Sequence, residues 1–387
     1  MGFVKLLIQQ RLPAWQVNLT APAVSIAFCV VAILCAALGS LVHLANVKVV
    51  EISRRYDNKF CKDILSKKAV NDSGWVNVSK GCVAEIEFLV DEELQQPVFL
   101  YYGLTQMYQN HRRYRNSRSD AQLMGANPRS IPDADPLAIP GDINGLKHAS
   151  IEYSGEQRHY SDFVYVPAGL VAWSMFNDSF TLYKRSDSGN GSENELICNG
   201  TDFSRSTNLP LGWSSNNKCH KKGIAWSTDV AKRFVKPNWN SEDLIWTAPR
   251  TEYGESSSPT TNDTCWNNGW YAGEPGHLIP VTTDEDLMVW MRTSPRPTLR
   301  KLYRVIDTTL TKGRYVMIIH DRYNVASFGG EKSFILTSTS FLGGKLTWLS
   351  FTYFAVSGLA VLFSIFIPLS SWLCSHRSRR TVKVLTG

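Results

Sequence analysis

Two long runs without a charged side chain, one near each end, dominate the hydrophobic pattern of the chain. They cover Pro22–Val47 and Leu346–Cys374, and neither contains Asp, Glu, Lys or Arg. A helix rises about 1.5 Å per residue, so each run can cross a hydrocarbon core of about 30 Å. A cleaved signal peptide is the alternative for the first run, but its apolar region is usually only about 7–15 residues long. The pattern therefore predicts two membrane-spanning helices.

Between these runs, short apolar segments alternate with stretches rich in Gly, Pro, Ser and Asn. Alternating apolar and polar residues, or a short apolar run bounded by turn residues, are typical of strands. The expected strand segments are Glu85–Val90, Gln96–Leu104, Leu287–Met291, Arg314–Asp321 and Ser333–Ser338. Thr181–Lys222 and Thr247–Gly276 are expected to be exposed insertions. The predicted fold class is a membrane protein whose two transmembrane helices flank a large, antiparallel, sandwich-like β-rich domain with long loops.

The charges of the two tails indicate how the chain is oriented. Neither tail has an acidic residue, and the basic ones are Lys5, Arg11, Arg377, Arg379, Arg380 and Lys383. Removing these six from the 41 basic residues leaves 35 in the middle, against all 34 acidic ones. Positive charge beside a span favours the cytosolic side, so both termini are expected in the cytosol. The predicted parts are a cytosolic segment (1–21), a first span (22–47), a lumenal or extracellular domain (48–345), a second span (346–374) and a cytosolic basic tail (375–387).

Glycosylation sequons and cysteines agree with a lumenal middle segment. The predicted N-glycosylation sites are Asn71, Asn77, Asn177, Asn190, Asn199 and Asn262. A further sequon at Asn18 lies in the expected cytosolic tail and should stay unglycosylated. Cys61–Cys82 and Cys198–Cys219 are the economical disulfide pairs, each worth roughly 3 kcal/mol by chain entropy. Cys265 is left over, and a Cys219–Cys265 pair stays open.

Motifs that carry chemistry are missing from the sequence. It contains no GxSxG, HExxH, P-loop or GxGxxG pattern, and no CxxC or HxxxH pair. Asp284-Glu285-Asp286 is interpreted as a solvated loop run. The basic-aromatic stretch Tyr108–Arg118 is interpreted as arginines that pair with carboxylates such as Glu92, Glu93 and Asp120, or that face headgroups, because a lumenal domain meets no nucleic acid. We therefore expect no catalytic residue, no cofactor and no metal.

Six stretches follow one another from the N-terminal tail to the second span, and they read QQRLPAW, PVFLYYGLTQMYQNHRRYRNSR, SMFNDSF, KKGIAWSTD, VWMRTSPRPTLRKLYRVI and LTSTSFLGGK. In this fixed order they resemble the CDC50/LEM3 family of accessory subunits of P4-type lipid-flipping ATPases. The resemblance implies a non-catalytic subunit that forms a heterodimer with a P4-type ATPase. It also implies that this subunit is required for exit of the ATPase from the endoplasmic reticulum and for phospholipid translocation.

The resemblance also suggests which residues meet the partner and the lipids. The expected partner-binding residues are Gln10, Arg11, Leu12, Pro13, Trp15, Trp290, Arg292 and Arg300. The expected location is an integral membrane protein of the endoplasmic reticulum, Golgi, endosomes or plasma membrane. Many family members have a cysteine where this chain has Ala168, with a partner cysteine upstream, so that disulfide is absent here.

Two other classes of protein fit the topology. A two-span ligand-gated channel subunit shares the two cytosolic termini and the glycosylated middle domain, although such domains usually hold more disulfides. A lumenal glycan- or headgroup-binding protein could use Arg112–Arg118. Ligand-evoked current would favour the channel, and glycan binding by the isolated middle domain would favour the binding protein.

Overall fold

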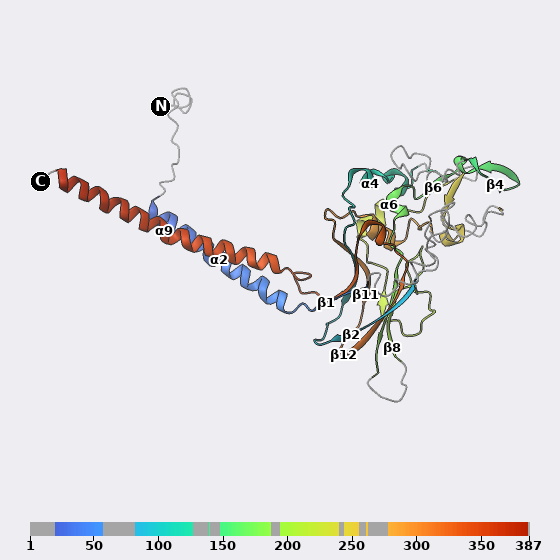
Figure 1. Ribbon diagram of the computed structural model, residues 1–387, viewed down its shortest axis with the longest axis horizontal. Coiled ribbons are helices and arrows are strands. Elements are labelled where there is room, and N and C mark those ends of the chain that lie inside the picture. Colours follow the sequence, from blue (N-terminus) through green and yellow to red (C-terminus); the bar gives the residue numbers. More distant parts are fainter. Residues whose placement is uncertain are drawn as a thin grey trace, which may run out of the picture. The chain divides into compact units, whose positions relative to one another are not determined.

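The computed structural model describes residues 20–56, 82–126, 139, 148–186, 194–239, 244–254, 261 and 278–385. It divides into a helical unit, Met1–Val49 with Ser340–Gly387, and a β-rich unit, Val50–Thr339 (Figure 1). The helices of the first unit are α2 (Ala21–Val47) and α9 (Thr347–Leu385). The strands of the second are β1 (Glu51–Arg55), β2 (Cys82–Val90), β3 (Val98–Leu104), β4 (Ser150–Tyr153), β5 (Glu156–His159), β6 (Val164–Val166), β7 (Ser179–Lys184), β8 (Glu195–Asn199), β9 (Cys219–His220), β10 (Ile245–Thr247), β11 (Leu299–Ile306), β12 (Gly313–Asp321) and β13 (Lys332–Thr337). Its helical turns are α4 (Arg112–Asn116), α5 (Asp120–Leu123), η3 (Tyr160–Asp162), α6 (Leu170–Trp173), η4 (Asp229–Arg233), η5 (Arg250–Tyr253), α8 (Glu285–Met291) and η6 (Ala326–Phe328).

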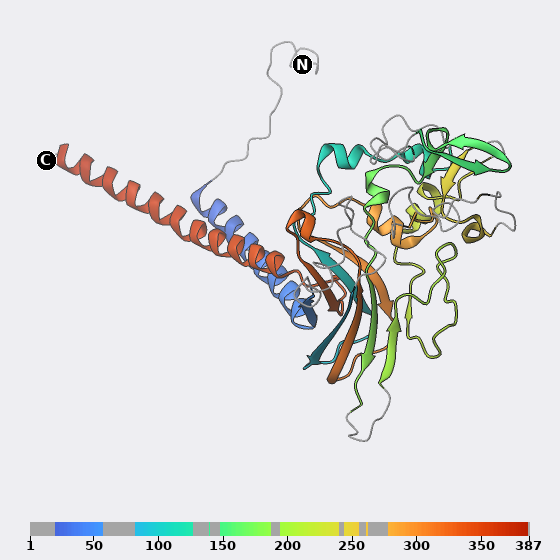
Figure 2. The ribbon, with the colours of Figure 1, turned by 45° about the vertical axis from the view of Figure 1, so that its right-hand side comes forward.

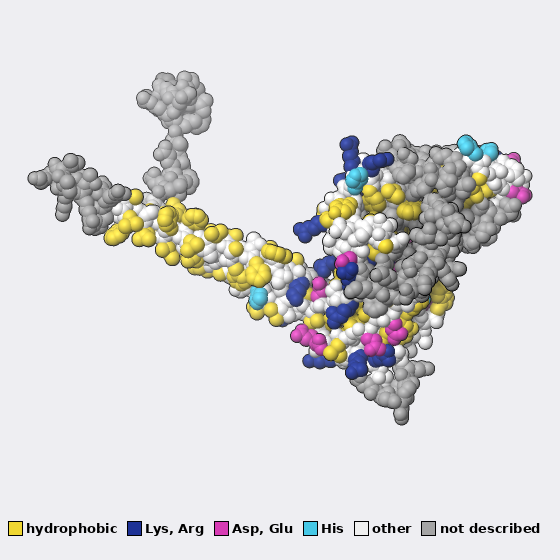
Figure 3. Space-filling view, viewed as in Figure 1, with side chains coloured by type: hydrophobic (Ala, Val, Ile, Leu, Met, Phe, Trp, Pro, Cys, Tyr) yellow, Lys and Arg dark blue, Asp and Glu magenta, His cyan; other side chains and the backbone are white. Residues whose placement is uncertain are grey.

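Helices α2 and α9 are the two apolar runs of the sequence. Their apolar stretches, Ala21–Val47 and Thr347–Cys374, have the length and composition needed to cross a membrane. Most of the large side chains along them are exposed, and apolar groups cover the face seen in Figure 3. Helix α9 continues past Cys374 to Leu385, so the predicted basic tail is helical for most of its length.

Small residues let the two helices pack closely and antiparallel. Ser357 Oγ donates to the Ala32 carbonyl at 2.9 Å, and Ser25 Oγ donates to the Ser364 carbonyl. A Cβ at Gly39 would lie 3.1 Å from the Phe354 ring, so this position has little room for a side chain. Lipid is as apolar as the helices, so close packing and such hydrogen bonds are what can favour helix association.

Two antiparallel sheets form the body of the β-rich unit. The predicted fold class, in which two apolar terminal helices flank an antiparallel β-rich domain, is confirmed. One sheet has the order β1-β13-β3-β11-β9 and the other β2-β12-β7-β8. Their long strands lie side by side, with the short helices and the β4–β5 hairpin beyond one end of them (Figure 2). Strand β2 alternates strictly, burying Ala84, Ile86, Phe88 and Val90.

Aromatic side chains fill the space between the two sheets. Phe88 of β2 lies 5.5 Å from Phe334 of β13, and Phe180 of β7 lies 5.1 Å from Tyr303 of β11, measured between ring centroids. These contacts join one sheet to the other in a single hydrophobic core. Face-to-face packing of two antiparallel sheets is the sandwich arrangement that the sequence predicted.

Two predictions for this domain are wrong. Leu287–Met291 is not a strand but the main part of helix α8, in which Leu287, Met288, Trp290 and Met291 are buried at helical spacing. Thr181–Lys222 is not simply an exposed insertion, because it contains β8, β9 and most of β7 and so contributes to both sheets. Most of Thr247–Gly276 lies outside the described residues.

A buried ammonium group joins three separate segments of the domain. Lys332 of β13 is fully buried, and its Nζ lies 2.7 Å from Asp178 Oδ2 and also contacts Asp321. The Tyr56 hydroxyl donates to Asp178 at 3.0 Å, and the backbone N–H groups of Arg322 and Tyr323 donate to its other oxygen. These donors offset the second negative charge of the cluster.

Lys332→Met is expected to destabilise the domain by about 3–5 kcal/mol, because it leaves two buried carboxylates without their cation. The thermal unfolding midpoint of the full chain in detergent measures this loss. The matched control is Lys312→Met, which removes an exposed lysine. A double variant, Asp178→Asn with Lys332→Met, should recover part of the loss; equal midpoints for Lys332→Met and Lys312→Met would contradict the role of the cluster.

Candidate partner-binding groove

A groove of about 610 Å³ lies among three short segments of the β-rich domain. Helix α4 with the residues after it, the π-helical turn η4, and the segment after α8 form its walls. Four arginines line it, Arg115, Arg118, Arg233 and Arg292, together with two acids, Asp120 and Asp229. The groove therefore has an excess of two positive charges. Basic side chains are also visible over α4 in Figure 3.

Trp290 fixes the end of α8 from which the groove wall continues. Its side chain is fully buried, and its Nε1–H donates to the Val171 carbonyl of α6 at 2.8 Å. Its ring also meets Tyr323 edge-on. Trp290 has no exposed surface in this chain, and its contact with a partner stays a prediction. Its role is to hold α8 in the core.

Arg292 leaves the end of α8 and binds Asp229 with two hydrogen bonds. Nε lies 2.5 Å from Oδ2 and a terminal nitrogen lies 3.1 Å from Oδ1, while the Asp229 side chain is only 2% exposed. The same guanidinium lies 4.3 Å above the ring of Trp226, which is itself 65% exposed. The ion pair and the cation–π contact together fix this wall.

The remaining arginines divide into one that is paired and several that are not. Arg118 Nε lies 3.0 Å from Asp120, and its guanidinium also donates to the Met291 carbonyl at 2.6 Å. Arg115 is exposed and makes no ion pair within the described residues. The same is true of its neighbours Arg112 and Arg113. Among the residues that the structure describes, the predicted pairing of this stretch with carboxylates therefore holds for Arg118 alone.

Arg233 is the second cation of the groove with free hydrogen-bonding capacity. It is 67% exposed and lies 3.9 Å from Asp229, whose two oxygens Arg292 already occupies. Arg115 and Arg233 thus bring guanidinium groups from two different elements to one groove. Planar guanidinium groups bind carboxylates in pairs of hydrogen bonds, so the groove suits acidic side chains.

The acidic run that begins α8 holds this helix in place. Asp284 lies 2.8 Å from Lys221, and Glu285 accepts hydrogen bonds from the backbone N–H groups of Gly223 and Ala225 at 2.8 and 3.0 Å. Asp286 pairs with Arg304 at 2.7 Å and with Lys221 at 3.1 Å. The interpretation of this run as solvated loop acids is wrong, because all three side chains bind the KKGIAW segment or β11.

The pKa values of the two aspartates in this run are shifted in opposite directions. Burial raises the pKa of Asp284 even though Lys221 opposes the shift. Burial would also raise the pKa of Asp286, but the charges of Arg304 and Lys221 prevail and hold it at about 2. The sequence shows three adjacent acids, but not that two of them share Lys221 and that Glu285 binds backbone N–H groups.

Lys301 supports the other end of α8. Its ammonium donates to the carbonyls of Val289 and Arg292, and the side chain is almost fully buried. Burial lowers its pKa to about 8, and the nearby Arg292 charge acts in the same direction. A cation at the last carbonyls of a helix interacts favourably with the helix dipole. No sequence pattern singled this residue out.

The other predicted partner residues lie elsewhere or outside the described residues. Arg300 of β11 forms an exposed ion pair with Glu51 at 3.1 Å and lies 5.5 Å from the Tyr101 ring centroid, away from the groove. Gln10, Arg11, Leu12, Pro13 and Trp15 are outside the described residues. Within the described residues, no group of three His, Cys, Asp or Glu side chains could hold a metal ion.

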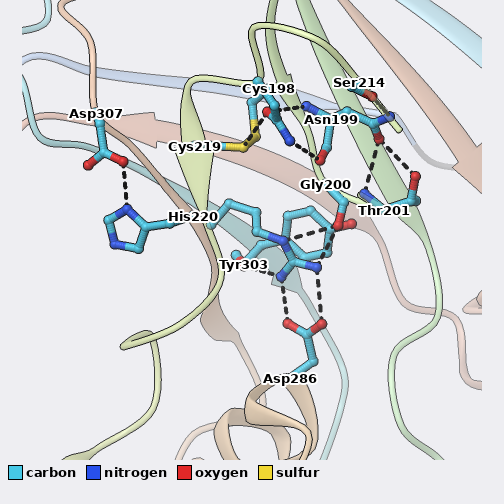
Figure 4. The surroundings of a disulfide bond; sticks show 12 residues. Cys198, Asn199, Gly200, Thr201, Ser214, Cys219, His220, Asp286, Tyr303 and Asp307 are labelled. Carbon is cyan, nitrogen blue, oxygen red and sulfur yellow. Dashed lines mark hydrogen bonds and ion pairs between the residues drawn. A yellow bond between two sulfur atoms is a disulfide. The ribbon is translucent and has the colours of Figure 1, made fainter. Parts of the chain in front are cut away.

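The disulfide joins a strand of one sheet to a strand of the other, and the sequon residue Asn199 follows Cys198 directly (Figure 4). Cys198 of β8 and Cys219 of β9 are bonded, with an S–S length of 2.02 Å. Asn199 is half-buried, and its Nδ2 donates to Ser214 Oγ at 2.8 Å, while Asn177 precedes the buried Asp178. Cys61, Cys265 and four of the predicted glycosylation sites, Asn71, Asn77, Asn190 and Asn262, lie outside the described residues, and for Cys82 only the backbone is described.

Comparison with known proteins identifies the family. A model of the LEM3 (ligand-effect modulator 3) family / CDC50 family matches residues 41–377. This chain belongs to the CDC50/LEM3 family. A cow protein named cell cycle control protein 50A is 32% identical over 368 residues, which cover 92% of this chain and 85% of that protein. ALA-interacting subunit 3 of Arabidopsis thaliana is 30% identical over 92% of this chain and 82% of that protein. The human cell cycle control protein 50B is 31% identical over 92% and 89%.

Family membership gives the motif blocks a structural meaning in this chain. SMFND supplies Asp178 to the buried cluster, and KKGIAW supplies Lys221 and the backbone donors that bind the α8 acids. VWMRTSPRP contributes Trp290, Arg292 and the last wall of the groove. The blocks therefore meet at the groove and in the core behind it, although they are far apart in the sequence.

Asp286→Asn is expected to lower the unfolding midpoint at neutral pH, because Arg304 then lies buried without its carboxylate. A folded pKa of about 2, below the ordinary 3.8, means that stability from ionised Asp286 is present above about pH 4 and is lost as the pH falls toward 2. The difference in unfolding free energy between wild type and variant should therefore become smaller by about 2 kcal/mol over that range. Unfolding midpoints from pH 6 to pH 2.5 measure it. Glu152→Gln, an exposed change on β4, is the control, and a constant gap would refute the assignment.

Proposed function

We propose that this chain is a non-catalytic accessory subunit of a P4-type ATPase that moves phospholipids between leaflets. The ordered motif blocks and the CDC50/LEM3 family match support it, as does the name of the Arabidopsis relatives, ALA-interacting subunits. In this proposal the chain pairs with the ATPase as a heterodimer. The ATPase needs it to leave the endoplasmic reticulum and to translocate lipid. The ATPase performs the chemistry.

The proposed topology places both termini in the cytosol and the β-rich domain in the lumen or outside the cell. Two apolar helices, basic tails and the distribution of sequons support it. The complex then belongs to the endoplasmic reticulum, Golgi, endosomes or plasma membrane. Glycopeptide mass spectrometry tests the orientation, because sequons in the β-rich domain should carry glycans and Asn18 should not. A glycan on Asn18 would contradict it.

The arginine groove is the surface we propose for the partner. Its walls are held by buried groups, Trp290 and the α8 acids, so its shape is fixed before binding. It also combines exposed Trp226 with arginines, and Trp and Arg are enriched among the residues that dominate binding energy at interfaces. Acidic residues on lumenal loops of the ATPase are the groups that Arg115 and Arg233 suit. Arg300 and the segment from Gln10 to Trp15 are proposed as further contacts.

Affinity purification of the tagged full chain from its own cells tests the proposed function. Mass spectrometry of the purified sample should identify a P4-type ATPase, and removal of this chain should retain that ATPase in the endoplasmic reticulum. A chain that reaches its final membrane alone and purifies without such an ATPase would contradict the proposal.

Reversing the charges of Arg115 and Arg233 in the groove should weaken the complex. For Arg115→Glu with Arg233→Glu we expect at least a tenfold drop in co-purified ATPase, equivalent to about 1.4 kcal/mol or more. The matched control is Arg112→Glu with Arg113→Glu, which reverses two exposed charges of helix α4 that do not line the groove. Quantitative mass spectrometry at fixed salt measures both. Equal losses for the two pairs would indicate a diffuse charge effect and refute the groove as the contact.

A further inference from the structure

A closed turn lies between strand β13 and helix α9. The N–H of Ser340 donates to the Gly343 carbonyl at 2.8 Å, and the N–H of Gly343 donates back to the Ser340 carbonyl at 2.9 Å. Ser340 Oγ also donates to the Gly343 carbonyl at 3.2 Å and accepts from the N–H of Leu342 at 3.3 Å. Gly343 has φ of +97°, which glycine adopts without strain. The turn thus holds its own shape and presents the two residues at its tip.

Those two residues are large and apolar, and they are exposed. Phe341 is 82% exposed and Leu342 41%, and Trp348, one residue into α9, is 86% exposed. Burying a Phe side chain is worth about 1.5–3 kcal/mol relative to leaving it in water. If the turn left Phe341 in water, the protein would not gain this free energy. The position of the turn in the chain indicates what surrounds Phe341 instead.

The position of the turn is set by the helix pair. The N–H of Leu346 donates to Asn46 Oδ1 at 2.7 Å, near the last residue of α2. The turn is therefore held at the end where α2 finishes and α9 begins. From Thr339 to Cys374 the sequence has no acidic residue and a single basic one, Lys345. The exposed apolar surface of the turn thus continues into the apolar surface of the spans.

We propose that the Ser340–Gly343 turn inserts Phe341 and Leu342 into the lipid leaflet on the side where α2 ends and α9 begins. Phe341 then lies at the boundary between headgroups and acyl chains, and Trp348 beside it sits where aromatic residues gather at membrane interfaces. Lys345 reaches up to the phosphates along its own stem. The turn is a lipid-binding element of this chain itself. It requires that α2 and α9 cross the membrane, but it does not depend on any ATPase.

Photo-crosslinking of the full chain in phospholipid nanodiscs tests this element. Phe341 is replaced by p-benzoylphenylalanine, which keeps an aromatic ring at an exposed position and leaves the core untouched. Phe363, 49% exposed on α9, is the lipid-facing control, and Trp213, 75% exposed, is the control for an exposed aromatic residue of the β-rich unit. The nanodiscs contain phosphatidylcholine and phosphatidylserine, and mass spectrometry identifies lipid adducts by peptide.

A lipid adduct at position 341 is expected in a yield close to that at 363 and at least tenfold above that at 213, because about 1.4 kcal/mol of burial already gives a tenfold preference. An adduct at 363 with none at 341 would overturn the proposal, as would an adduct at 341 to a second copy of the chain. If neither position 341 nor position 363 gave a lipid adduct, both the membrane-spanning helices and the insertion of the turn would be contradicted. A lipid adduct at 341 without any co-purifying ATPase would support the turn and contradict only the proposed function.

Discussion

The buried ammonium of Lys332 is the contact on which the β-rich domain depends. It lies on β13 and binds Asp321 at the end of β12 and Asp178 before β7, so one side chain joins a strand of the first sheet to two segments of the second. Burial, followed by the nearby Asp178 charge, raises the pKa of Tyr56 well above its usual value and keeps the hydroxyl a donor. Buried ions are costly unless every group has a partner. This cluster therefore tolerates only the arrangement in which the sheets meet as they do.

The groove also depends on buried charges that each have a partner. Each acid at the start of α8 has its own buried or backbone partner, and Lys301 binds the carbonyls at the other end. Both ends of this seven-residue helix are thus fixed by charge, and Trp290 holds its last turn in the core. The segment that follows carries Arg292 and has little freedom. A binding surface built this way loses little entropy when a partner arrives.

Sequence periodicity predicted the parts of the fold in which one face is apolar. The two spans were found because their apolar runs are long, β2 because its residues alternate, and β12 because it is a short apolar run. It failed at α8, where an almost continuous apolar run has no clear period and the acids before it act as N-terminal capping groups rather than solvated ones. The groove could not be predicted, because its walls come from three segments whose proximity depends on ion pairs between distant residues. The motif blocks identified the right segments without showing that they meet.

The two units solve opposite problems of stability. In the helix pair the apolar surface faces outward and small residues such as Gly39 and Ser357 form the contact, whereas in the β-rich unit the apolar surface is inside and buried ion pairs fix its arrangement. Side chains that contribute neither to the helix contact nor to the core of the β-rich unit therefore indicate where other molecules bind. Among the described residues Arg115 has no carboxylate partner, Arg233 shares Asp229 with Arg292 at 3.9 Å, and Phe341 is an aromatic residue outside any core. We propose that each of these side chains binds a group from outside the described residues, and the chemistry differs: carboxylates for the arginines and lipid for the phenylalanine.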